Sequence, residues 1–206
     1  MKNPICNANV ALFALVTAAS IALLAACSTS VQEPPTPTPV VLPSPGAFID
    51  SADCSDLEYG YLGQSKVTVS LGDLDLKVIV EIADDPSERA QGLMCRESIP
   101  AGTGMFFYYP EPKTIGFWMY NTYVPIDILY IERSHNVADK ITMTPCLRDG
   151  LSDGNWQVKC ATEATNYVPK GEWITALELP AGWLESNDIS DADIYDVKVN
   201  WLTVAD

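Results

Sequence analysis

The stretch KVTVSLGDLDLKVIVEI, residues 66–82, decides the fold. Apolar and polar side chains alternate along it on both sides of the Gly72-Asp73 pair. A period of two places every second side chain on the same face of a strand, and a Gly-Asp pair is typical of a turn. The stretch therefore predicts two strands separated by a turn, each with one apolar face that must be buried.

The same period recurs further along the chain. Within residues 125–132, Ile126 and Ile128 lie on one face of the expected strand, and Asp127 and Leu129 lie on the other. Further strands are expected at residues 106–109, 116–120, 173–179 and 195–204. The domain is therefore expected to be rich in β structure.

One segment breaks this pattern and has the features of a helix start. Asp85 is suited to the N-cap, Pro86 to the first helical position, and Glu88 to the third position of a capping box. The predicted helix runs from about 86 to 96. Many short strands and one short helix favour a mostly β fold, either a compact antiparallel β barrel or a half-open sandwich.

The N-terminus has the features of an export signal. Lys2 precedes an apolar run over residues 10–26, which is short for a membrane-spanning helix. The run ends in Leu24-Ala25-Ala26-Cys27, which resembles the lipobox of bacterial lipoproteins. The resemblance implies a diacylglyceryl group on the Cys27 thiol and cleavage just before it, so that residues 1–26 are a signal peptide. The alternatives are an uncleaved anchor helix or a plain signal peptide with an incidental cysteine.

Residues 27–47 are rich in proline, threonine and serine, a composition that favours an extended tether. Residues 48–206 have the length of a single domain. We therefore expect an exported protein that contacts the membrane through lipid on Cys27. It would lie at the periplasmic face of an outer membrane or the outer face of a plasma membrane.

Composition excludes several functions. The formal net charge of −15 argues against nucleic-acid binding, because phosphate contacts need lysine and arginine. The chain has one histidine, His135, which leaves little material for a catalytic triad or most zinc sites. No metal, cofactor or catalytic residue is predicted, and the protein is expected not to be an enzyme.

Four cysteines lie in the domain, and an exported protein meets an oxidising compartment, so disulfides are expected. Four cysteines allow three pairings. Cys146 and Cys160 are the favoured pair because residues 147–159, which contain two Asp-Gly pairs, are expected to form a loop. Cys54 and Cys95 then remain as the second pair. A zinc site is the alternative, but no Cys-x-x-Cys spacing supports it.

Four blocks in the middle of the chain carry a family resemblance. They are RAQGLMCR at residues 89–96, GMFF at 104–107, FWMYNT at 117–122 and VPIDI at 124–128. Their order and spacing resemble the family called domain of unknown function 192 (DUF192), over roughly residues 66–203. The resemblance implies a small, mostly β fold and no established activity.

Two residues depart from the family pattern. Tyr120 stands where such proteins commonly have lysine, and Cys95 fills a slot that is often apolar. If the usual lysine serves an anion, that role is lost or altered in this chain.

The residues of these blocks suggest a binding site. Arginine binds carboxylate or phosphate in bidentate fashion, and tryptophan stacks on sugars or flat groups. The predicted site consists of Arg89, Arg96, Trp118, Asn121 and Asp127. The alternative is structural: an arginine paired with Asp127 or Glu178, Asn121 in a turn, and Trp118 in the core.

The functional hypothesis is a lipid-anchored protein of the cell envelope that binds a small anionic or saccharide ligand. One alternative is a scaffold or accessory protein without a ligand cleft. A second is a hydrolase of envelope glycans that uses Asp127 and Glu178 as paired carboxylates.

Overall fold

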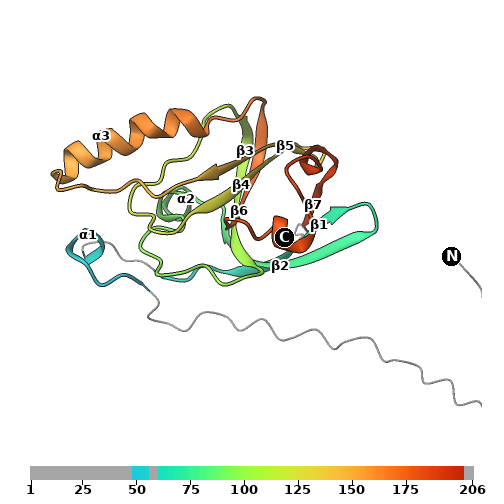
Figure 1. Ribbon diagram of the computed structural model, residues 1–206, viewed down its shortest axis with the longest axis horizontal. Helices are drawn as coiled ribbons and strands as arrows, with labels where there is room; N and C mark the ends of the chain where they lie inside the picture. The colour runs from blue at the N-terminus through green and yellow to red at the C-terminus, as the bar shows by residue number, and fades with distance from the viewer. Residues whose placement is uncertain (1–47, 56–59, 202–206) are drawn as a thin grey trace, which may run out of the picture. The chain divides into compact units, whose positions relative to one another are not determined.

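The hairpin expected over residues 66–82 forms, and its two strands are the first, in chain order, of a single seven-stranded sheet (Figure 1). A computed structural model describes residues 48–55 and 60–201, and the predictions for the signal peptide, the tether and Cys27 lie outside the described residues. The strands are β1 (Gln64–Leu71), β2 (Leu74–Ala83), β3 (Thr103–Lys113), β4 (Ile126–Ile131), β5 (Val137–Met143), β6 (Trp173–Pro180) and β7 (Lys198–Trp201).

The helical elements are short, with one exception. They are α1 (Ala52–Ser55), α2 (Pro86–Gln91), α3 (Asp153–Glu163) and the 3-10 turns η1 (Ala164–Tyr167), η2 (Glu185–Asn187) and η3 (Ile194–Asp196). Because η1 follows α3 directly, the two make one 15-residue helix. No helix in the described part of the chain is long and apolar enough to cross a membrane.

The strand order is β5-β4-β6-β3-β2-β1-β7. Neighbouring strands are antiparallel except β2 and β3, which are parallel and are connected through α2. The sheet curls until its two edges approach: the Val137 N–H donates to the Val197 carbonyl at 3.2 Å, and Asn136 forms a β-bridge with Lys198. The result is a half-barrel, which confirms the predicted mostly β class and adds a parallel strand pair to it.

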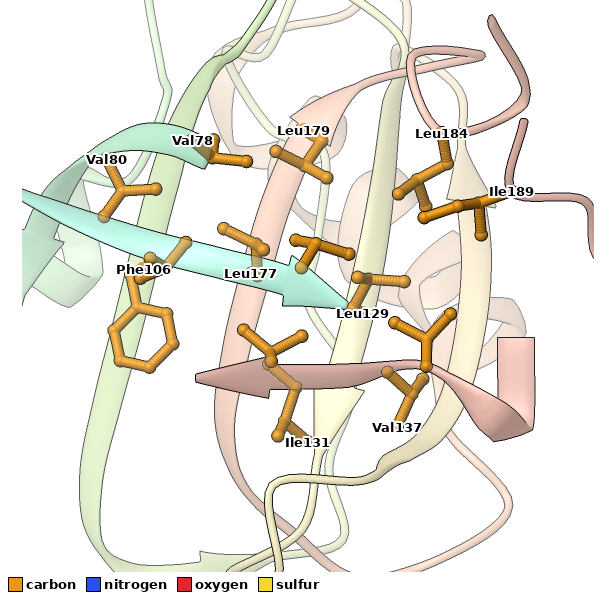
Figure 2. Packing of buried hydrophobic residues seen from close by; sticks show 14 of the residues in the cluster. Val78, Val80, Phe106, Leu129, Ile131, Val137, Leu177, Leu179, Leu184 and Ile189 are labelled. Atoms are coloured by element: carbon orange, nitrogen blue, oxygen red, sulfur yellow. The ribbon is translucent and has the colours of Figure 1, made fainter. Parts of the chain in front are cut away.

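The curled sheet separates two apolar cores. The inner core holds Phe106, Leu129 and Leu177 from the sheet, together with Leu184 and Ile189 from the segment after β6 (Figure 2). The outer face of the sheet carries a second cluster, which α3 and the segments around residues 93 and 119 cover. The alternation predicted for β4 is therefore confirmed, because Leu129 belongs to the inner core and Ile128 to the outer one.

The predicted helix starts where expected and ends early. Asp85 accepts hydrogen bonds from the Ser87 and Glu88 N–H groups, and the Glu88 side chain accepts from the Asp85 N–H, so the capping box is complete. The helix ends at Gln91 rather than near 96 because Gly92 adopts a φ of 51°, which glycine tolerates and which stops the helix.

The loop expected at residues 147–159 is wrong for most of its length, because α3 begins at Asp153. Trp156 and Cys160 lie one turn apart on α3, and both are buried against the outer core. Tertiary packing of these two side chains outweighs the weak helix preference of the Asp-Gly sequence.

The strand expected at residues 116–120 is also wrong, since this segment crosses the outer face without pairing in the sheet. Gly116 passes so close to the end of η1 that a Cβ there would lie 2.5 Å from the Tyr167 carbonyl oxygen. The last expected strand starts later than predicted: residues 194–196 form η3, and β7 begins at residue 198 and continues to residue 201, the last one described. The sequence interpretation also missed β5.

The favoured disulfide, Cys146–Cys160, forms, and the two remaining cysteines form Cys54–Cys95. Disulfides are typical of proteins in an oxidising, extracytoplasmic compartment. The first joins α1 to the segment after α2, and the second joins the segment after β5 to α3. Both therefore fix pieces of chain that cover the outer face of the sheet.

Candidate functional site

The five residues of the predicted site do not form one cluster. Asp127 lies on the face of β4 that carries Leu129, toward the inner core, whereas Trp118 belongs to the segment over the outer face. Asp127 is 1% exposed. Its carboxylate accepts hydrogen bonds from the Thr142 hydroxyl at 2.5 Å and the Gly182 N–H at 2.8 Å, so it ties β4 to its neighbours.

Arg96 is enclosed on the outer side and has a structural partner. It is 3% exposed, and its Nη2 lies 2.8 Å from the Glu81 Oε2 on β2. Its guanidinium group lies against the rings of Phe48 and Tyr61, 4.6 and 4.4 Å from their centroids, and the two rings also contact each other. Glu81 also accepts a hydrogen bond from the Leu62 N–H at 2.6 Å. The ion pair therefore fastens the segment before β1 to the sheet.

Arg89 is occupied as well. From the end of α2 its Nη1 donates to the carbonyl oxygens of Asp84 and Tyr108, the latter at 3.0 Å. Its guanidinium group lies 4.8 Å from the centroid of the Tyr109 ring. These contacts attach α2 to β3 and leave Arg89 outside the large cleft described below.

Asn121 organises a turn beneath the surface. It is fully buried with a φ of 53°, a conformation that asparagine tolerates better than most residues. Its carbonyl accepts from the Cys95 N–H at 2.7 Å, and its Nδ2 donates to the Asp53 carbonyl at 3.3 Å. The main-chain carbonyl thus ties this turn to the segment after α2, and the side chain ties it to α1, as the structural alternative expected.

Trp118 is the one predicted site residue that borders a large cleft. It is 40% exposed and lies on a cleft of about 810 Å³. The walls come from α1, from α2 over its whole length, from the beginning of α3 and from Trp118 and Tyr120, with Met94 on the lining. Ligand pockets in proteins usually have volumes of ~300–1,000 Å³, so the cleft has the size to hold a small molecule.

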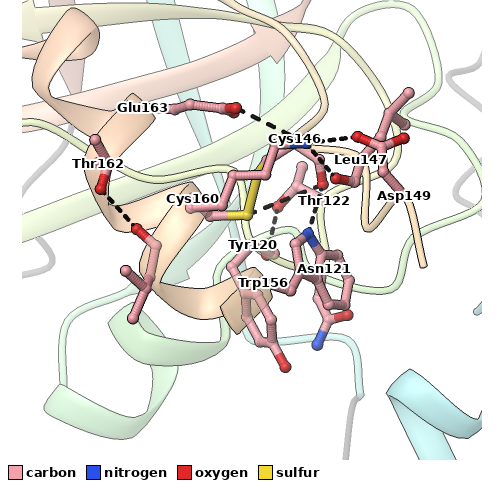
Figure 3. Close-up of a disulfide and its surroundings, with 12 residues drawn as sticks. Tyr120, Asn121, Thr122, Cys146, Leu147, Asp149, Trp156, Cys160, Thr162 and Glu163 are labelled. Atoms are coloured by element: carbon pink, nitrogen blue, oxygen red, sulfur yellow. Dashed lines mark hydrogen bonds and ion pairs between the residues drawn. A yellow bond between two sulfur atoms is a disulfide. The ribbon is translucent and has the colours of Figure 1, made fainter. Parts of the chain in front are cut away.

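A row of rings supports Trp118. The Tyr120 ring lies 5.2 Å from the Trp118 ring and 4.5 Å from the Trp156 ring, measured between centroids. Trp156 in turn donates its indole N–H to the Cys146 carbonyl at 2.9 Å. Figure 3 shows Tyr120 and Trp156 beside the Cys146–Cys160 disulfide. The disulfide and α3 therefore hold Trp156 in place, and Trp156 supports the aromatic wall of the cleft, which consists of Trp118 and Tyr120.

The polar lining of the cleft is acidic. Asp85 and Glu88 stand on the α2 wall, and Asp53 and Asp153 stand on the walls from α1 and α3. The N–H of Glu88, together with the Ser87 hydroxyl, stabilises the charged form of Asp85 and holds its pKa below the usual value. Gln91 and Gln157 add amide groups, and among residues 48–55 and 60–201 no lysine or arginine lines the cleft.

Sequence interpretation missed most of this lining. The acids of α3 could not be placed because the helix was taken for a loop. The spacing of Trp156 and Cys160 at i and i+4 was the available signal, since two large or apolar side chains at this spacing indicate a buried helix face. The departure from the family pattern at Tyr120 was the signal for the aromatic row.

The paired carboxylates of the hydrolase alternative lie apart. Leu179, not Glu178, pairs with Asp127 across β4 and β6, and Glu178 pairs with Ile128. Since side chains alternate along strands, Asp127 and Glu178 point to opposite faces of the sheet and cannot flank one bond. Cys95 is held in a disulfide and supplies no thiolate. In the described residues, no group of three or more His, Cys, Asp or Glu side chains could hold a metal.

Comparison with solved structures shows the same fold in two bacterial proteins. One, from Sinorhizobium meliloti, is described as a candidate transcription regulator; it has a TM-score of 0.54, 23% identity, and covers 69% of this chain and 97% of its own. The other, from Novosphingobium aromaticivorans, has unknown function, a TM-score of 0.52 and 22% identity, and covers 77% of this chain and 94% of its own.

No curated protein matches the chain. A family model does match: DUF192, described as "Uncharacterized ACR, COG1430", over residues 67–196. This range begins within β1, ends with η3, and includes strands β2 to β6 and all four motif blocks. The chain belongs to the DUF192 family.

Proposed function

We propose that this protein is a saccharide-binding module of the cell envelope and that the cleft beside Trp118 is its binding site. The exposed indole of Trp118, supported by Tyr120, is the observation that carries the proposal. A flat aromatic surface in a polar cleft suits a sugar ring, which has one apolar face and a polar edge. Carboxylate and amide groups around it can bind hydroxyl groups.

The lining favours a saccharide over the small anion of the original hypothesis. Both predicted arginines have partners elsewhere, and no lysine or arginine of the described residues lines the cleft. An anionic ligand would meet four acidic side chains, of which only Asp53 and Asp153 are paired with a cation, Arg148.

Replacing Trp118 by alanine should weaken saccharide binding by tenfold to a hundredfold, because the stacking surface is lost. This corresponds to ~1.4–2.7 kcal/mol of binding free energy. The test is isothermal titration of the N-acetylglucosamine tetrasaccharide into the protein, purified in a detergent that carries no sugar.

Tyr195→Ala is the matched control, since Tyr195 is an exposed aromatic residue on η3 that does not line the cleft. The control should bind like the unsubstituted protein. Equal affinities for Trp118→Ala and the unsubstituted protein would rule out the cleft as the site.

The proposal includes the lipid anchor on Cys27. The lipobox-like Leu24-Ala25-Ala26-Cys27 and the proline-rich residues 27–47 support it, and the two disulfides agree with an exported protein. Lipid attachment would hold the domain at the membrane at the end of its tether.

Replacing Cys27 by alanine should move the protein from the membrane fraction to the soluble or secreted fraction, because the thiol that accepts the lipid is gone. Detergent phase partitioning followed by mass spectrometry of the N-terminus measures both the change and the lipid. Cys6→Ala should leave the distribution unchanged, as Cys6 lies before the expected cleavage point. Membrane retention of a Cys27→Ala protein that mass spectrometry shows to have lost residues 1–26 would contradict the anchor.

A further inference from the structure

The charge of the cleft narrows the class of saccharide that it can hold. Asp85 and Glu88 face it from α2, and Asp53 and Asp153 face it from α1 and α3. Trp118, Tyr120 and Met94 line the same cleft. The ligand would therefore meet both aromatic and acidic side chains.

A cation offsets the negative charges of Asp53 and Asp153 but not those on the α2 side of the cleft. Arg148 pairs with Asp53 and, at 2.7 Å, with Asp153, so one cation offsets two carboxylates there. Asp85 and Glu88 form no ion pair with any cation in the described residues; they accept only hydrogen bonds from the first turn of α2 and the residues before it. The α2 wall thus presents two carboxylates that have no ion-pair partner in the described residues, although the charge of Arg89 acts on Asp85 from a distance.

The capping box leaves part of each acid available. Asp85 accepts through Oδ1 and Glu88 through Oε2, and the Asp85 Oδ2 and the Glu88 Oε1 have no hydrogen-bond partner among residues 48–55 and 60–201. Two carboxylate oxygens on one wall can therefore accept from a cation that enters the cleft.

The aromatic wall independently favours a cation. The faces of tryptophan and tyrosine rings attract ammonium groups through their quadrupoles, and tryptophan does so most strongly. Trp118 and Tyr120 line the same cleft as Asp85 and Glu88. Aromatic faces and free carboxylate oxygens together make a site that suits a positively charged group flanked by an apolar ring face.

We propose that the saccharide bound in this cleft carries free ammonium groups, as a de-N-acetylated amino sugar does. This inference rests on the proposed function, which requires only that the cleft bind a saccharide. It adds that the ammonium group is held by Asp85 and Glu88 while the sugar ring lies on Trp118.

The test compares two tetrasaccharides that differ only in acetylation, glucosamine tetrasaccharide and N-acetylglucosamine tetrasaccharide, by isothermal titration at pH 6. The amine form should bind at least tenfold more tightly in 50 mM salt. The difference should shrink in 500 mM salt, because salt screens exposed charges.

The decisive variant is Asp85→Asn with Glu88→Gln. Asparagine is a good N-cap and glutamine completes a capping box, so the double change removes two charges and keeps the helix start. It should weaken binding of the amine tetrasaccharide by tenfold or more and leave binding of the acetylated one unchanged. Glu88→Gln alone, which keeps the Asp85 cap, should give a smaller loss in the same direction. Glu185→Gln, an exposed acid on η2 outside the cleft, should change neither affinity.

The outcomes separate the two proposals. Equal or tighter binding of the acetylated form, with dependence on Trp118, would overturn the ammonium inference and leave the saccharide site intact. Amine binding that the double variant does not change would also overturn the inference. Binding of neither tetrasaccharide would contradict both.

Discussion

The Glu178→Gln variant is expected to be more stable than the unsubstituted protein at pH 9, by roughly 5 kcal/mol of unfolding free energy. Glu178 lies on β6 between Met105 of β3 and Ile128 of β4, is 4% exposed, and has no hydrogen bond or ion pair within the described chain. Burial among apolar side chains disfavours its charged form and raises its pKa to about 8.

The direction in which unfolding free energy changes with pH follows from proton binding in the folded and unfolded states. From pH 4.5 to about pH 8 the unfolded chain has lost the proton of Glu178, whereas the folded protein keeps it. Because the folded state binds more protons, unfolding free energy falls as pH rises through this window, by ~1.4 kcal/mol per unit of pKa difference. Glutamine has the shape of the protonated acid and no charge to lose.

Urea unfolding of both proteins at pH 4.5, 6, 7.5 and 9 measures this effect. The two stabilities should be close at pH 4.5, and the variant should gain through the window and level off above pH 8. Glu185→Gln is the control, since Glu185 lies in the exposed 3-10 turn η2. A constant difference between Glu178→Gln and the unsubstituted protein at all four pH values would contradict a buried, neutral Glu178.

The second large effect is expected at Arg96. Replacing it by methionine, which is similar in length, should lower the unfolding free energy by ~3–5 kcal/mol, because Glu81 would remain buried without its partner. The rings of Phe48 and Tyr61 would also lose the cation that lies against them. Urea unfolding measures the loss.

A double-mutant cycle identifies its cause. Adding Glu81→Leu to Arg96→Met removes the Glu81 carboxylate that the first change leaves buried without a partner. It should restore part of the stability, since an apolar pair can replace a buried ion pair. Saccharide affinity should stay within twofold of the unsubstituted protein in both variants, as neither residue lines the cleft. Loss of binding without loss of stability would instead place Arg96 in contact with the ligand.

The sequence predicted those parts of the fold that have a local pattern. The hairpin of β1 and β2 and the two faces of β4 follow from alternation, and the start of α2 follows from Asp85, Pro86 and Glu88. The elements that failed depend on distant contacts. The α3 helix is fixed by packing of Trp156 and by a disulfide, and residues 116–120 cross the sheet next to Tyr167.

The same limit applies to the site. Alternation in β4 already placed Asp127 opposite Ile126 and Ile128, and it lies on the inner face, away from the Trp118 cleft. The partners of Arg96 could not be foreseen because Phe48 and Glu81 lie far from it in sequence. The acidic lining was out of reach for a related reason: Asp53 and Asp153 meet through Arg148 only after α1 and α3 have packed.

The central claim is that the cleft beside Trp118 binds a saccharide. The chain has five tryptophans, whose indole N–H signals can be followed by NMR while each tetrasaccharide is titrated into the protein. We predict that the Trp118 signal shifts with saturation and that the signal of Trp201, which packs against His135 and lies outside the cleft, does not move. A Trp118 signal that stays in place with both tetrasaccharides would contradict the claim.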